Sequence, residues 1–263
     1  VVTVAACSQG RQWEIAVMLK ENALQLLGTE FNPDAALAVF NAVISGCEKA
    51  RHWTLALQQL EDLRRISCEA NVITYSALIS ACEKSQRWEA ALQLWEDLHG
   101  DSVRPELISY NAAIRACEEK WRSILMFMEE LEDDARLSAN LVTYNSAISC
   151  FAVGYQWQYA LDMMQGMGKR RLTPSLVTTM GLWTACLKGG RPAFILDLVQ
   201  HEDFHSNDAA LATVALGACE ATGKLGGATK LLVGAEQRFC KNHHQVTLAQ
   251  NQACFRWVLI FSF

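Results

Sequence analysis

Two sets of residues in this sequence have types and spacings that could support metal chemistry. The first is the run H-E-D-F-H at 201–205, which matches the H-E-x-x-H pattern of zinc hydrolases. On one helix face its two histidines would bind zinc, the glutamate would act as general base, and Glu220 would be a third ligand. The run lies at the expected end of a helix, just before Ser206, and no other part of a protease domain accompanies it. Zinc hydrolysis therefore ranks behind the two functions considered below, and metal analysis of the purified chain would test it.

The second set is the ten cysteines, which include no C-x-x-C pair. Cys47, Cys82 and Cys117 follow one another at intervals of 35 residues. Zinc ligands must converge within a few ångströms, usually as close pairs, and one cysteine in each repeat does not do so. We predict instead that these cysteines are reduced, in a reducing compartment, and fill small spaces between stacked helices.

The cysteine interval divides the chain into repeats, which positions every other feature. Units span 37–71, 72–106, 107–140, 141–175, 176–208 and 209–243, after a partial unit at 1–36 and before a degenerate repeat or tail at 244–263. The clearest unit is VITYSALISACEKSQRWEAALQLWEDLHGDSVRPE, at 72–106.

Each unit predicts two helices. In the first helix of the 72–106 unit, Tyr75, Leu78, Ile79 and Cys82 recur at three- and four-residue steps, which is typical of an amphipathic helix. The second helix begins near a tryptophan such as Trp88, whose regular spacing favours packing between repeats. The expected helix N-caps are Thr74, Ser109, Thr143 and Thr178. Pro33, Pro105 and Pro174 are expected to mark the ends of units.

Two helices of this length cannot bury their apolar faces alone, but stacked hairpins can. The sequence therefore predicts an all-α fold, a right-handed α-solenoid of stacked helix-turn-helix repeats. Of the 263 residues 51% are hydrophobic, but no run is long and apolar enough for a transmembrane helix, so we expect no membrane partner. The net charge of −5 is unusual for a nucleic-acid binder, since these carry a basic footprint.

The text VITYSALISACEK, followed by WEAALQLWEDL and RPE, closely resembles the repeat of the pentatricopeptide (PPR) family. The resemblance covers roughly residues 1–232 and is strongest at 37–175. It distinguishes the chain from tetratricopeptide proteins, whose period is 34 residues and whose Trp-Leu-Gly-Tyr signature is missing here. It implies a non-catalytic protein that binds single-stranded RNA in a chloroplast or mitochondrion and serves in mRNA processing, stability or translation.

The resemblance also implies a role for three places of each unit, with one base read per repeat. The fifth and last residues would hydrogen-bond a base edge, and the second would pack on the base face. The base-reading residues would be Asn41 with Asn71, Ser76 with Glu106, Asn111 with Asn140, Asn145 with Ser175, and Thr213. The base-stacking residues would be Ala38, Ile73, Ile108, Val142 and Val177.

By the family's code, the two Asn–Asn pairs would favour pyrimidines and Asn145 with Ser175 would favour cytosine. Ser76 with Glu106 fits no established pair. In the 176–208 unit the fifth residue is Met180, which cannot read a base edge by hydrogen bonding.

Lysines follow the repeated cysteine by two residues in three units, at Lys49, Lys84 and Lys188. They would either contact phosphates or only compensate the helix dipole, and the sequence leaves both readings open. Because basic positions are sparse, we expect modest, salt-sensitive RNA affinity. The alternative is a solenoid that binds a peptide or protein partner in the same groove and no RNA.

No phosphate-binding loop, nucleophile elbow or cluster of aspartates is present, so we predict no enzyme activity, no metal and no small-molecule cofactor. The chain does not begin with Met and has no basic, Ser-rich leader, so we expect a fragment without its targeting peptide.

Overall fold

The computed structural model describes residues 13–27, 32–195 and 217–223, and the regular elements within them are α-helices. The chain divides into two compact units, Val1–Ala185 and Cys186–Phe263. The helices are α2 (Trp13–Leu27), α3 (Pro33–Ala50), α4 (Trp53–Arg65), α5 (Val72–Lys84), α6 (Trp88–Gly100), α7 (Leu107–Ala116), α8 (Trp121–Asp133), α9 (Leu141–Val153), α10 (Trp157–Lys169) and α11 (Leu176–Lys188). None of these helices has the length and hydropathy needed to cross a membrane.

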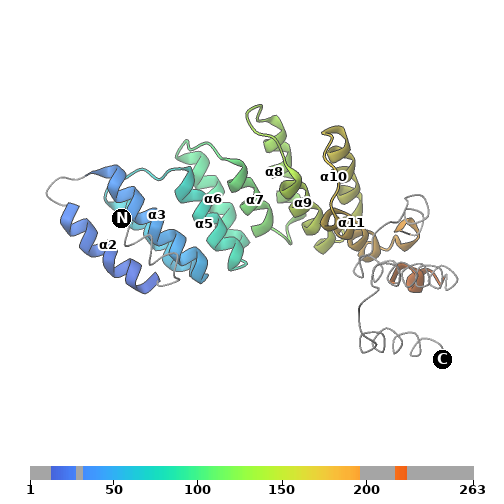
Figure 1. Ribbon diagram of the computed structural model, residues 1–263, viewed down its shortest axis with the longest axis horizontal. Coiled ribbons are helices and arrows are strands. Elements are labelled where there is room, and N and C mark those ends of the chain that lie inside the picture. Colours follow the sequence, from blue (N-terminus) through green and yellow to red (C-terminus); the bar gives the residue numbers. More distant parts are fainter. Residues whose placement is uncertain (1–12, 28–31, 196–216, 224–263) are drawn as a thin grey trace, which may run out of the picture. The chain divides into compact units, whose positions relative to one another are not determined.

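Within the first compact unit, the helices pair into hairpins that follow one another along the chain (Figure 1). The first helices of the hairpins pack directly on one another, α3 on α5, α5 on α7 and α7 on α9. Each second helix packs on the first helix of its own hairpin, and α4, α6 and α8 also contact the first helix of the next one. This arrangement confirms the predicted α-solenoid of helix-turn-helix repeats.

The hydrophobic core lies between the two helices of each hairpin and between neighbouring hairpins. The predicted stripe of α5, Tyr75, Leu78, Ile79 and Cys82, is at most 1% exposed. Leu98 of α6 is also fully buried. Burying one large apolar side chain stabilises the fold by about 1.5–3 kcal/mol, so packing between hairpins holds these short helices together.

The predicted helix N-caps are wrong by three residues. Helix α5 is capped by Asn71, whose Oδ1 accepts the backbone N–H of Thr74 at 3.0 Å, and α9 is capped in the same way by Asn140. Thr74 is instead the third helical residue, and its Oγ1 accepts the backbone N–H of Asn71 at 3.3 Å. Thr143 and Thr178 also occupy this third position, which completes a reciprocal capping box.

The predicted N-cap Ser109 is likewise a third helical residue, because α7 is capped by Glu106. The expectation that Pro33 ends a unit is also wrong, since α3 begins at Pro33 itself. Asn32 caps this helix, and its Oδ1 accepts the backbone N–H groups of Asp34 at 3.0 Å and Ala35 at 3.2 Å. Proline suits the first helical position because the N–H it lacks would have no partner there.

The turns use a left-handed backbone at fixed places. Arg51, Gln86 and Tyr155, each the fifteenth residue of its unit, have φ of 61°, 55° and 59°. Ser67, Ser102 and Arg171, each the thirty-first residue, have φ of 55°, 57° and 57°. These non-glycine residues carry strain of about 1 kcal/mol each.

The 107–140 unit departs from this pattern. Its first helix, α7, has 10 residues where α5 and α9 have 13. Trp121 follows Leu107 by 14 residues, whereas Trp88 follows Val72 by 16. The unit has no non-glycine residue with positive φ. The shortening lies in the first helix, which ends about a turn early, while the connection to α8 spans 117–120 where that between α5 and α6 spans 85–87.

Candidate nucleic-acid interface

The second residue of successive units is apolar and exposed on the first helices. Ile73, Ile108, Val142 and Val177 are 61%, 67%, 52% and 57% exposed, and Ala38 is exposed as well. They lie on the first helices of successive hairpins, α3, α5, α7, α9 and α11. Large apolar side chains left in water at one repeated place are typical of a surface that contacts another molecule.

Two of the four predicted polar pairs are joined by a hydrogen bond. Asn41 Nδ2 donates to Asn71 Oδ1 at 3.5 Å, and Asn145 Nδ2 donates to Ser175 Oγ at 3.3 Å. In each case the last residue of a unit caps the next helix, so the two members of the pair come from neighbouring hairpins. The pairs therefore lie across the junctions between repeats.

The other two predicted pairs are not joined. In the described part of the chain, no hydrogen bond links Ser76 to Glu106 or Asn111 to Asn140. Glu106 and Asn140 are exposed at the start of α7 and α9, while Ser76 and Asn111 are half-buried.

Sequence reasoning missed a further contact, from the third residue of the next unit. Thr74 Oγ1 donates to Asn41 Oδ1 at 2.7 Å, and Ser109 Oγ lies 2.7 Å from Ser76 Oγ. The signal was present in the sequence as a Thr or Ser at the third place of four units, but it was interpreted as a helix cap.

The same contact is present at one further junction and absent at another. Thr178 Oγ1 donates to Asn145 Oδ1. At the remaining junction Thr143 Oγ1 donates instead to Asn140 Oδ1 at 3.1 Å. Asn111 Oδ1 is buried there and accepts no hydrogen bond from any residue that the structure describes.

Of the three predicted phosphate-binding lysines, Lys84 is held in an ion pair. Its Nζ lies 2.7 Å from Glu48 Oε1 on the preceding repeat, and Ser80 Oγ donates to the same oxygen at 2.9 Å. Lys49 and Lys188 are exposed at the last turns of α3 and α11, where their positive charge also interacts favourably with the helix dipole.

A second ion pair follows one repeat later, and the sequence analysis did not identify it. Arg115 of α7 pairs with Glu83 of α5 at 2.7 Å. Both pairs join neighbouring first helices, and in each of them a glutamate neutralises a positive charge on these helices.

Comparison with known families agrees with this geometry. Residues 36–84 and 70–119 match the PPR repeat family, and residues 142–172 match the PPR repeat. The chain belongs to the pentatricopeptide repeat family. Comparison with curated protein sequences gave no match.

Solved PPR structures share the fold. The crystal structure of PPR10 from maize is 21% identical, with a TM-score of 0.65 over 89% of this chain and 33% of that one. PPR10 in complex with an 18-nt psaJ RNA element is 18% identical, with a TM-score of 0.54 over 93% and 38%. The PPR domain of Arabidopsis thaliana protein-only RNase P 1, in complex with tRNA, is 14% identical, with a TM-score of 0.52 over 86% and 98%. This chain thus spans about a third of the length of PPR10.

The tryptophans of this PPR array pack between repeats, as predicted. The residue that precedes α4, α6 and α8 lies beside the tryptophan of the preceding repeat. His52 lies 4.6 Å from Trp13 between ring centroids. The guanidinium of Arg87 lies 5.2 Å from the ring centroid of Trp53, and the Lys120 ammonium lies 4.1 Å from that of Trp88. At the next junction the Trp121 ring stacks on Tyr159 at 5.3 Å.

The cysteines also behave as packing residues. All seven in the described residues are buried and free of disulfides. Burial raises the pKa of Cys82 to about 11 and that of Cys117 to about 12, from an ordinary 9.0, so both thiols are protonated near neutral pH. In the part of the chain that the structure describes, no three His, Cys, Asp or Glu side chains gather as metal ligands would.

Among the predicted site residues, the H-E-x-x-H run and Thr213 fall outside the described residues, as do most of the predicted 209–243 unit and the whole of the predicted 244–263 tail. Glu220, the proposed third zinc ligand, is exposed on a short helix.

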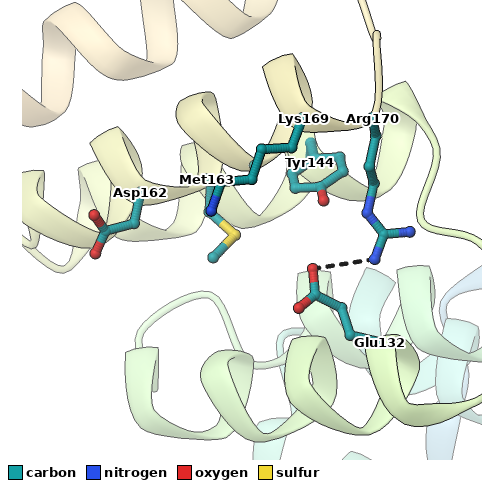
Figure 2. A pocket seen from close by; sticks show the side chains of 7 residues that line it. Glu132, Tyr144, Asp162, Met163, Lys169 and Arg170 are labelled. Atoms are coloured by element: carbon teal, nitrogen blue, oxygen red, sulfur yellow. Dashed lines mark ion pairs between the residues drawn. The ribbon is translucent and has the colours of Figure 1, made fainter.

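A cavity of about 330 Å³ lies among α8, α9 and α10, and none of the second-place residues lines it (Figure 2). Glu132 and Arg170 pair across it at 3.3 Å. Gly166 leaves room beside the Tyr144 ring, whose buried hydroxyl makes no hydrogen bond of normal geometry with any described residue. At the corresponding place one junction earlier, Tyr110 donates to Glu130 at 3.0 Å, so the cavity marks a junction that is less completely packed.

Proposed function

We propose that this chain binds single-stranded RNA along the surface of its first helices, one base per repeat, and selects among bases through its fifth and last residues. The proposal makes the chain a non-catalytic adaptor in organellar RNA processing, stability or translation. The organellar part rests on family membership.

One observation carries the proposal: the exposed apolar residue at the second place recurs beside a polar group at each junction. An aliphatic side chain offers a base a flat contact at little polar cost, and an adjacent Asn or Ser offers donors and acceptors to its edge. Repetition at every hairpin gives a row of such sites. PPR10 is a protein of the same fold that was crystallised with an RNA element.

Electrostatics set the expected strength of binding. With Lys84 and Arg115 both paired to glutamates, few cations on the first helices are available to phosphates. Each phosphate contact releases counterions and adds about one to the slope of log affinity against log salt. We therefore expect a shallow slope and modest affinity.

A binding titration tests the proposal. The chain is titrated with pyrimidine-rich and purine-rich RNA oligomers of equal length, and with DNA of matching sequence, at two salt concentrations. Asn111→Ala with Asn145→Ala should change base preference. Lys84→Ala, which leaves the Glu48 carboxylate without its cation, should weaken binding to all sequences alike with little change in the salt slope. The matched control, Gln58→Ala with Gln158→Ala, removes two exposed amides from second helices and should change neither. Equal, salt-independent affinity for every oligomer would overturn the proposal.

A second candidate function is a protein-binding solenoid without RNA. The two interhelical ion pairs favour it, because they neutralise the positive charge that RNA requires. In the same titration, this candidate predicts no RNA binding by the unmodified chain at low salt.

A further inference from the structure

The third residue of each unit lies beneath the fifth residue of the preceding unit. Thr74, Ser109, Thr143 and Thr178 are all 0% exposed. Each accepts the backbone N–H of the N-cap residue on its own helix, at 3.3, 3.4, 3.3 and 2.9 Å. A hydroxyl that is already an acceptor keeps one hydrogen to donate.

At the first junction this hydrogen fixes the amide of Asn41. Thr74 Oγ1 lies 2.7 Å from Asn41 Oδ1 and 3.0 Å from Asn71 Oδ1, so the shorter contact favours Asn41 as the acceptor. With Oδ1 directed inward, the Nδ2 group faces Asn71 and keeps one further N–H to donate.

Two other junctions give the same result. Ser109 Oγ and Ser76 Oγ lie 2.7 Å apart, and either hydroxyl can be the donor. We assign the donor to Ser109, which already accepts from the Glu106 N–H, and the hydroxyl hydrogen of Ser76 is then left to donate outward. Thr178 donates to Asn145 Oδ1, and Asn145 Nδ2 reaches Ser175.

The fourth junction lacks this restraint. Thr143 donates to Asn140, and Asn111 Oδ1 is buried without a donor from the described residues. A buried carbonyl left unpaired costs about as much as a lost hydrogen bond, and no hydrogen bond from the described residues holds this amide with Oδ1 directed inward.

We propose that the buried third-place hydroxyl is a positioning residue for the reading site of the preceding repeat: Thr74, Ser109 and Thr178 make their sites donate an N–H or O–H to a base acceptor, whereas Thr143 leaves Asn111 free to turn. This rests on the proposed function. It adds a specificity determinant outside the second, fifth and last places, and assigns it to the neighbouring repeat.

Thr74→Val and Thr143→Val form a matched pair, because each removes a buried hydroxyl from the same kind of capping box with little change in shape. RNA is selected from a randomised pool by the unmodified chain and by each variant, and single-base preferences are then measured by titration. The position whose preference Asn41→Ala erases identifies the base facing the 37–71 unit. Thr74→Val should reduce discrimination at that position by roughly two- to tenfold, the worth of one neutral hydrogen bond. Thr74→Ser should restore it.

Thr143→Val should lose similar thermal stability to Thr74→Val, yet leave discrimination unchanged at the position that Asn111→Ala identifies. Should Thr74→Val not fold, Thr178→Val tests the same contact at the Asn145 junction. If the unmodified chain binds RNA and Asn41→Ala alters its preference while neither Thr74→Val nor Thr178→Val does, positioning by the hydroxyl is refuted and RNA binding stands. If the unmodified chain binds no RNA, both proposals fall.

Discussion

Glu48 and Lys84 occupy neighbouring repeats and form a contact of 2.7 Å between Oε1 and Nζ. The lysine holds the place expected to contact phosphate, yet its charge is balanced by a carboxylate that is only 18% exposed. A partly buried pair is screened less by salt than a surface pair. An RNA phosphate must therefore compete with Glu48 for this lysine.

Removing the competing carboxylate should strengthen RNA binding. In Glu48→Gln, Lys84 is released toward phosphate, so affinity at low salt should rise several-fold and the salt slope should steepen by about one. Glu96→Gln, which removes the same charge from an exposed place on α6, is the control. Equal gains in the two variants would mean that only net charge matters and that the pair has no special role.

Shortening an exposed second-place residue should affect binding and spare the fold. Ile108 is 67% exposed, so Ile108→Ala should change the free energy of unfolding by less than about 0.5 kcal/mol. Loss of the base contact should weaken RNA binding by about three- to tenfold. On the same helix, Ile114 is fully buried, and Ile114→Ala should cost about 2–5 kcal/mol of stability. Chemical denaturation and RNA titration together separate the two effects.

The cation–π contact between Lys120 and Trp88 should contribute to stability. A double-mutant cycle with Lys120→Met and Trp88→Leu isolates the interaction from the other effects of each change. At an exposed site we expect a coupling energy of about 0.5–1 kcal/mol. A coupling energy of zero within error would show that the contact between Lys120 and Trp88 does not stabilise the fold.

Glycine at a left-handed turn position should stabilise the array. Gln86 has a φ of 55°, and Gln86→Gly should relieve strain and raise the free energy of unfolding by roughly 0.5–1 kcal/mol. Glu96→Gly, inside α6, should lower it by about 1 kcal/mol. Thermal melts of both variants check the prediction, and a destabilised Gln86→Gly would contradict it.

The buried thiols should make the fold sensitive to alkali. The folded-state pKa of Cys82 is about 11, above the ordinary 9.0, so its stabilising contribution is complete below pH 9 and is lost as pH rises through 11. At pH 10 this amounts to about 1 kcal/mol for one such cysteine. Tyr75, whose pKa burial raises to about 12, acts in the same direction above pH 10. Urea titrations under reducing conditions at pH 7.5 and pH 10 should show the loss, and Cys82→Ala should reduce it.

The fold was predictable because its signals are local. The stripe through Tyr75, Leu78 and Ile79 depends only on helical periodicity, and all three residues are buried as expected. The helix starts were predicted wrongly, because the first buried residue was taken as the start of each helix. The true first turn carries exposed residues such as Ile73, which lie outside the buried stripe, and a capping box with threonine in place of glutamate was not recognised.

The contacts between repeats were beyond sequence reasoning for a different reason. Glu48 and Lys84 are 36 residues apart, and whether they meet depends on how far α5 is shifted along α3. The same holds for Thr74 beneath Asn41. Periodicity gives the face on which a residue lies, but not its height relative to the neighbouring helix.

The capping residues Asn71 and Ser175 each begin one hairpin and touch a polar side chain of the hairpin before it. The smallest recognition element is thus a boundary, shared by two hairpins. An array of n repeats then offers n − 1 complete elements, and its final repeat contributes half of one. Moving a single repeat into another array would change the base preference at two RNA positions, its own and that of its upstream neighbour. Repeats are therefore best exchanged as overlapping pairs.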